Sequence, residues 1–143
     1  MSTPILPETG ASPGRVPALR ARLAVLVAFV ACAGSPRRLQ RFLRLLARGA
    51  RRPDPEDLLR WRQAVVSVSS RCAGEGCLPR SVATIVLART FGCSATWKTG
   101  LRQDPFLAHA WVELDGVPIG EPESVRHFRT SLVVEPSFTG GRG

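Results

Sequence analysis

The sequence lacks the segments and fingerprints that would assign it to several large classes of protein. Residues 1–17 are rich in proline and contain no basic segment followed by an apolar one, so we expect no secretory signal peptide. The longest apolar stretch, residues 23–34, is too short to span a bilayer. Glycine-rich phosphate loops, a dinucleotide fingerprint and nucleic-acid-binding signatures are absent as well. The sequence therefore predicts a cytoplasmic protein without a membrane span, a cofactor or a nucleic-acid partner.

Lysine is almost missing too, and arginine takes its place. The chain has 20 basic residues, of which one is lysine, and a formal net charge of +9. Residues 1–74 hold thirteen arginines and four acidic residues, whereas residues 75–143 hold seven basic and seven acidic residues. An excess of positive charge confined to one half of the chain indicates that this half binds an acidic protein surface, nucleic acid or a membrane face. The alternative is that the arginines only solvate the outsides of helices.

Four cysteines are present, and without a signal peptide we expect them to be free thiols in a reducing compartment. Cys72, Cys77 and Cys93, together with His109, have the side chains that a zinc site needs. The spacing of Cys72 and Cys77 is loose for such a site, and Cys93 follows the end of a buried helix. The sequence therefore predicts no metal site.

The order of periodic patterns predicts helices first and an antiparallel sheet afterwards, which is an α+β fold. Helices are expected over residues 18–33, from 36 to a stop near 49, from 55 to before 74, and over 78–91. Strands are expected over residues 95–101, 108–114, 117–121 and, at an edge, 131–135. The expected divisions are a disordered tail (1–17), a basic helical region (18–74), a catalytic core (75–138) and a frayed tail (139–143).

Cys77 and His109 are the candidate catalytic pair. Cys77 opens the apolar helix, where the positive end of the helix dipole stabilises a thiolate, and His109 lies on a downstream strand. Taken alone, Cys77 would be interpreted as an inert buried thiol and His109 as an ordinary strand histidine. Together they are typical of papain- or transglutaminase-like thiol enzymes, and Gly74 and Gly76 would let backbone approach the site closely.

The third member of such a triad is an acid, and hairpin geometry favours Glu121. Asp115 lies at the turn Asp115-Gly116, too far along the strand from His109, and its residue type suits the turn itself. A three-residue loop would place Glu121 on the His109 face, and a two-residue loop would place it on the opposite face unless a bulge at Pro118 or Gly120 corrects the register. Glu113 and Asp115 remain the alternatives.

Four segments taken together resemble the transglutaminase-like leader peptidases of lasso-peptide biosynthesis: residues 77–81, 97–100, 106–116 and 119–121. The resemblance covers about residues 55–135. It implies a cysteine protease that cuts the leader from a ribosomally made precursor peptide, followed by a separate ATP-dependent cyclase. The family's triad is Cys, His and an acid, usually Asp. Cys77 and His109 match directly, and Glu121 falls where the acid is expected.

The resemblance also implies partners. Residues 1–74 show no strand hairpin of a fused leader-recognition domain, so the chain is similar to the split form, which relies on a separate recognition protein. The basic half would dock that protein or the leader, and the candidate docking residues are Arg37, Arg41, Arg44 and Arg48. Trp97 and Trp111 would wall the substrate groove, although core packing is the ordinary role of such residues.

Two other functions fit the same residues. One is a non-enzymatic, basic interaction protein on a degenerate thiol-enzyme fold. The other is a transglutaminase-type acyl transferase, in which an amine replaces water. The reactivity of Cys77 separates the first from an enzyme, whereas the sequence does not separate hydrolysis from acyl transfer.

Overall fold

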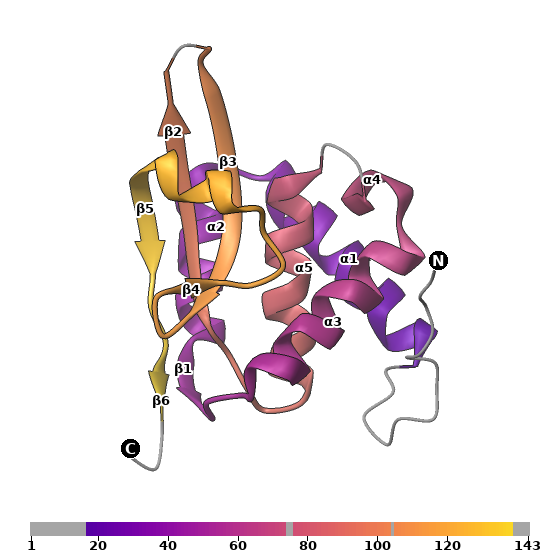
Figure 1. Cartoon of the computed structure of the whole chain (residues 1–143). Helices are drawn as coiled ribbons and strands as arrows, with labels where there is room; N and C mark the ends of the chain where they lie inside the picture. The colour runs from indigo at the N-terminus through magenta and orange to yellow at the C-terminus, as the bar shows by residue number, and fades with distance from the viewer. Residues whose placement is uncertain (1–16, 74–75, 104, 139–143) are drawn as a thin grey trace, which may run out of the picture.

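A computed structural model describes residues 17–73, 76–103 and 105–138 (Figure 1). The expected tails at 1–17 and 139–143, apart from Pro17, lie outside the described residues, as does Gly74. The helices are α1 (Ala18–Ala33), α2 (Pro36–Leu46), α3 (Pro55–Val68), α4 (Ser70–Ala73) and α5 (Cys77–Thr90). The strands are β1 (Arg48–Ala50), β2 (Thr96–Arg102), β3 (Leu107–Leu114), β4 (Val117–Pro118), β5 (Arg129–Val134) and β6 (Ser137–Phe138), and a 3₁₀ segment, η2, spans Glu123–His127.

Three layers make up the fold (Figure 1). The main sheet has the strand order β4-β3-β2-β5 with antiparallel pairing throughout, so β5 is an edge strand as expected. Helix α5 lies between this sheet and the pair α1 and α3, which pack against its other side. The α+β class with a buried helix on an antiparallel sheet is therefore confirmed. The short parallel pair β1–β6 and the segment η2 were not predicted.

The helices begin where local chemistry predicts. In α2 the Ser35 side chain accepts a hydrogen bond from the backbone N–H of Arg38 at 3.2 Å, which satisfies one N–H of the first turn. Helix α3 begins at Pro55, a residue that suits the first helical position, and carries Glu56 and Asp57 in its first turn. In α5 every residue from 80 to 88 is buried, because the sheet and two helices surround it.

The β3–β4 hairpin has the two-residue loop, one of the two loop lengths that the sequence left open. Leu114 pairs with Val117, so the loop has two residues, and Asp115 and Gly116 both have positive φ angles, 54° and 79°. The three-residue loop is therefore wrong. Strand β4 also ends at Pro118 rather than at residue 121, because Gly120 adopts a φ of 69° and turns the chain out of the ladder.

A single buried cluster links the basic helical region to the sheet. Its members come from all five helices and from β2, β3 and β5, and among the largest fully buried side chains are Trp97, Leu43, Leu58 and Ile85. The expected boundary at residues 74 and 75 thus lies between helices that share one core. Among the described residues, no helix is both long and apolar enough to cross a membrane.

Candidate active site

Cys77 occupies the first position of α5, with Gly76 as the N-cap residue. Its thiol is half-buried and hydrogen-bonds the His109 side chain and the backbone of Ala110. The His109 hydrogen bond lowers the pKa of the Cys77 thiol; burial opposes this, and the Ala110 bond and the positive charges of His109 and Arg80 add to the lowering. Cys77 is therefore poised to form a thiolate, whereas burial raises the pKa of Cys32 to about 11 and also raises that of Cys93.

His109, on β3, lies between Cys77 and Glu121. Its Nε2 is 2.7 Å from Oε1 of Glu121, which leaves Nδ1 as the ring nitrogen for Cys77. Hydrogen bonds with Cys77 and then with Glu121 raise the pKa of His109 to about 9, although burial acts in the opposite direction. A histidine with a raised pKa beside a thiol with a lowered one favours an imidazolium–thiolate pair.

Glu121 reaches His109 because of the turn at Gly120. In the observed register the last ladder bond, from the N–H of Ile119 to the carbonyl of Val112 (2.9 Å), would leave Glu121 opposite Ala110. The left-handed Gly120 redirects the chain and brings the carboxylate to the imidazole. The bulge alternative at Gly120 thus describes the structure better than the longer loop.

Arg62, on α3, holds the other oxygen of Glu121. Its Nη2 lies 3.2 Å from Oε2, and the Glu121 side chain is only 3% exposed. Burial would raise the pKa of Glu121, but the hydrogen bond and charge of His109, together with the charges of Arg62 and Arg80, outweigh it and lower that pKa. A Cβ on Gly120 would lie 2.8 Å from Cδ of Arg62, so the chain here packs directly against the arginine.

The other candidate acids have partners of their own. Asp115 lies at the exposed hairpin tip and forms an ion pair with Arg52. Glu113 is 7% exposed, accepts a hydrogen bond from Nε1 of Trp111 at 2.9 Å and pairs with Lys98 at 2.9 Å. Glu121 is accordingly the acid that the structure places on His109.

Both candidate groove tryptophans are covered in the structure, each about 2% exposed. Nε1 of Trp97 donates to Oγ of Ser81 at 2.9 Å, which ties β2 to α5. Trp111 stacks on His109, with ring centroids 5.8 Å apart, and Phe128 lies 5.6 Å from the same imidazole. Their visible contribution is packing that fixes the His109 ring.

Sequence reasoning missed several residues that shape the site. Arg62 and Phe128 are distant from Cys77 in the chain, and nothing local marks them. Arg80 is the fourth residue of α5; it is 9% exposed and donates from Nη1 to the carbonyl of Cys72 at 2.9 Å. A basic residue one turn into a buried helix was the available signal for Arg80. The docking candidates Arg37, Arg41, Arg44 and Arg48 are exposed on α2 and β1.

Within the described residues, no group of three or more histidine, cysteine, aspartate or glutamate side chains is arranged to hold a metal ion. The four cysteines are free thiols.

The chain was also compared with known proteins. A family model described as the transglutaminase-like superfamily matches residues 22–133, from within α1 to within β5. No curated protein and no solved structure gives a significant match.

Proposed function

Because the chain belongs to the transglutaminase-like superfamily, which includes cysteine proteases and acyltransferases, we propose that it is a cysteine protease that removes the leader from a lasso-peptide precursor. The observation that carries the enzymatic part is His109 bridging Cys77 and Glu121. The lasso-peptide assignment is supported by the resemblance of residues 77–81, 97–100, 106–116 and 119–121, which form the start of α5, β2, β3 and the turn to Glu121.

The proposed reaction is peptide hydrolysis, and the arrangement of Cys77, His109 and Glu121 supports each of its steps. The Cys77 thiolate attacks the carbonyl carbon of the last leader residue, and the backbone N–H groups of Cys77 and Leu78 at the start of α5 stabilise the oxyanion. The imidazolium of His109 gives its proton to the departing amine, so the peptide bond breaks and a thioester remains on Cys77. His109 then takes a proton from water, which attacks the thioester carbonyl. The C–S bond breaks, the leader leaves as a carboxylic acid, and the Cys77 thiolate and the His109 imidazolium are restored.

Glu121 and Arg62 act on His109 rather than on the substrate. Glu121 fixes the ring orientation and stabilises the imidazolium, and Arg62 holds the carboxylate in place. A non-enzymatic protein has no need of a half-buried thiol with a lowered pKa, so these contacts favour the enzyme over the degenerate-fold alternative.

The proposal includes partners in the cytoplasm: the precursor peptide, a separate leader-recognition protein and the cyclase that follows. Arg37, Arg41, Arg44 and Arg48 are the proposed docking residues, because all four are exposed and the surplus charge lies in their half of the chain. Cleavage by the pair should then weaken as salt rises, since the Debye length falls from about 10 Å at 0.1 M to about 3 Å at 1 M.

The test is cleavage of a lasso precursor, followed by mass spectrometry, with and without its recognition protein in water enriched in ¹⁸O. Hydrolysis places one ¹⁸O in the new leader carboxylate, whereas acyl transfer to an added amine gives an unlabelled amide. Cys77→Ala and His109→Ala should abolish release, and Cys32→Ala should not. Release by Cys77→Ala at a near wild-type rate would exclude the thiol mechanism.

The docking part has its own control. The double variant Arg41→Glu/Arg44→Glu should slow cleavage by the pair and leave the intrinsic reactivity of Cys77 unchanged. If the protease alone cuts as fast as the pair, no recognition protein is needed. If the pair is needed but neither salt nor the double variant matters, the arginines only solvate the helix.

A further inference from the structure

Helix α1 buries its small residues and exposes its large ones. The inward face against α5 and α3 consists of Ala21, Ala24, Val25 and Ala28. The outward face carries Leu19, Leu23, Leu26 and Val30, which are 68%, 54%, 60% and 68% exposed. A helix that is apolar on all sides is normally covered on all sides. An uncovered row of large aliphatic side chains marks an interaction surface.

The spacing of this row specifies a shape for the partner. The four residues follow one another at intervals of four, three and four, which is the alternation of positions a and d in a heptad repeat. We call the row of Leu19, Leu23, Leu26 and Val30 the α1 seam. Such a seam receives the knobs of a second α-helix lying alongside. Arg20 and Arg22 fall at the flanking e and g positions, and both are exposed.

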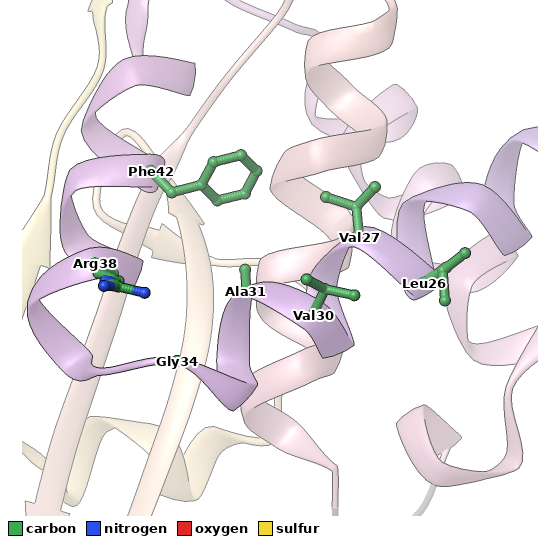
Figure 2. A pocket seen from close by; sticks show the side chains of 7 residues that line it. All are labelled: Leu26, Val27, Val30, Ala31, Gly34, Arg38 and Phe42. Carbon is green, nitrogen blue, oxygen red and sulfur yellow. The ribbon is translucent and has the colours of Figure 1, made fainter.

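Two grooves border the α1 seam. One, of about 470 Å³, lies between α1 and α2; Figure 2 shows Val27, Val30 and Ala31 on α1, with Phe42 extending from α2 toward α1 and Gly34 at the turn between the two helices. The other, of about 520 Å³, runs along the side of α1 that faces α5 and is lined by Leu19, Leu23 and Val86, among others. Concave apolar surface on both sides suits side chains that project from a partner helix better than it suits a flat lipid surface.

We propose that the α1 seam is the docking site for an amphipathic helix of a separate protein, with leucine-like residues along its seam and acidic residues at its flanks. Charge complementarity selects this occupant. Residues 17–53 contain no acidic residue, and Arg38 and Arg20 line the two grooves beside the seam. A second copy of the chain would bring arginines against arginines, which disfavours self-association. The surface contains none of the triad residues, so the proposal does not depend on the reaction at Cys77.

The probe is a synthetic helical peptide of about three heptads with leucine at a and d and glutamate at e and g, and a twin with lysine at e and g. The affinity of each peptide for the full-length chain is measured by fluorescence anisotropy at low and high salt. Leu26→Glu tests the seam. Leu45→Glu is the matched control, because Leu45 is also 60% exposed but lies on α2 and lines neither groove. Circular dichroism melting and the alkylation rate of Cys77 check that both variants are folded.

The acidic peptide should bind the wild type and Leu45→Glu with the same affinity. Its affinity for Leu26→Glu should be about tenfold or more lower, since burial of one leucine contributes about that factor. The lysine twin should bind the wild type more weakly than the acidic peptide does, and high salt should reduce the difference between the two affinities. The proposal is overturned if the acidic peptide does not bind or if both variants lose affinity equally. It is also overturned if sedimentation shows a seam-dependent dimer, or if anionic phosphatidylglycerol vesicles bind the seam when the peptide does not.

Discussion

Gly120 should be the backbone position on which the triad depends most. Its φ of 69° turns Glu121 toward His109, and a Cβ there would lie 2.8 Å from Cδ, 3.0 Å from Nε and 3.1 Å from Nη1 of Arg62. In Gly120→Ala the arginine side chain has to move, because the new methyl group occupies its place. Arg62 is the ion-pair partner of Glu121, so the carboxylate loses its support.

Gly116 provides a matched control for the backbone effect. Its φ is 79°, and a Cβ there would meet nothing within 4 Å. Each alanine variant should lose about 1–2 kcal/mol of unfolding free energy from the left-handed backbone alone. Gly120→Ala should also weaken a charged hydrogen bond, worth about 1.5–3 kcal/mol. Because about 1.4 kcal/mol equals one pKa unit, the pKa of His109 should fall by about one unit or more, and the pKa of the Cys77 thiol should rise because a less charged imidazole stabilises the thiolate less.

The assay combines urea unfolding with the rate of Cys77 alkylation by iodoacetamide near neutral pH. Gly116→Ala should lose stability and keep its alkylation rate. Gly120→Ala should lose stability and react more slowly, because a smaller fraction of Cys77 is ionised. Equal alkylation rates in the two variants would refute the argument that Gly120 holds Glu121 on His109.

The remaining predictions concern the charged groups of the site. Glu121→Gln should lower kcat/KM by about 10²–10⁴, and Asp115→Asn should leave it near the wild-type value, since the Asp115 side chain is 61% exposed at the hairpin tip; equal losses would remove Glu121 from its role. Arg62→Met should slow turnover and change the pH profile of turnover, and Arg62→Lys should restore part of the rate and part of the profile. A pH profile unchanged in Arg62→Met would mean that Arg62 has only a structural role. In Cys77→Ala the pKa of His109, followed by NMR, should fall from about 9 toward 6.5 without reaching it, because Glu121 still raises it; an unchanged value would mean that Cys77 does not contact the imidazole.

The sequence predicted the parts of the fold that local chemistry controls. The limits of α1 match the expectation, Pro55 begins α3, and the buried helix begins at Cys77, within one residue of the expected start. These elements depend on periodicity, capping and proline positions within a few residues of each other. Cys77 and His109 were recognisable for the same reason, since each lies at a characteristic place on its own element.

Contacts between distant segments were harder to predict. The hairpin register depended on whether the turn had two or three residues, and the sequence left both lengths open. Glu121 was nevertheless the acid found on His109, because a backbone angle at Gly120, rather than the register, decides where it points. Arg62 was not found, since its role arises only when α3 packs beside the turn after β4, and no local pattern encodes that approach.

The pH dependence of alkylation at each of the four cysteines tests most directly whether Cys77 is an activated thiol. The protein is labelled with iodoacetamide across a pH series, and each cysteine is quantified by peptide mass spectrometry. A thiol reacts as pH rises through its pKa, so the lowered pKa of Cys77 predicts a midpoint below the ordinary value of 9.0. Cys32, whose pKa is raised to about 11, should react only in strong alkali. A Cys77 midpoint at or above 9.0, with a rate no greater than that of Cys32, would contradict the proposed thiol enzyme.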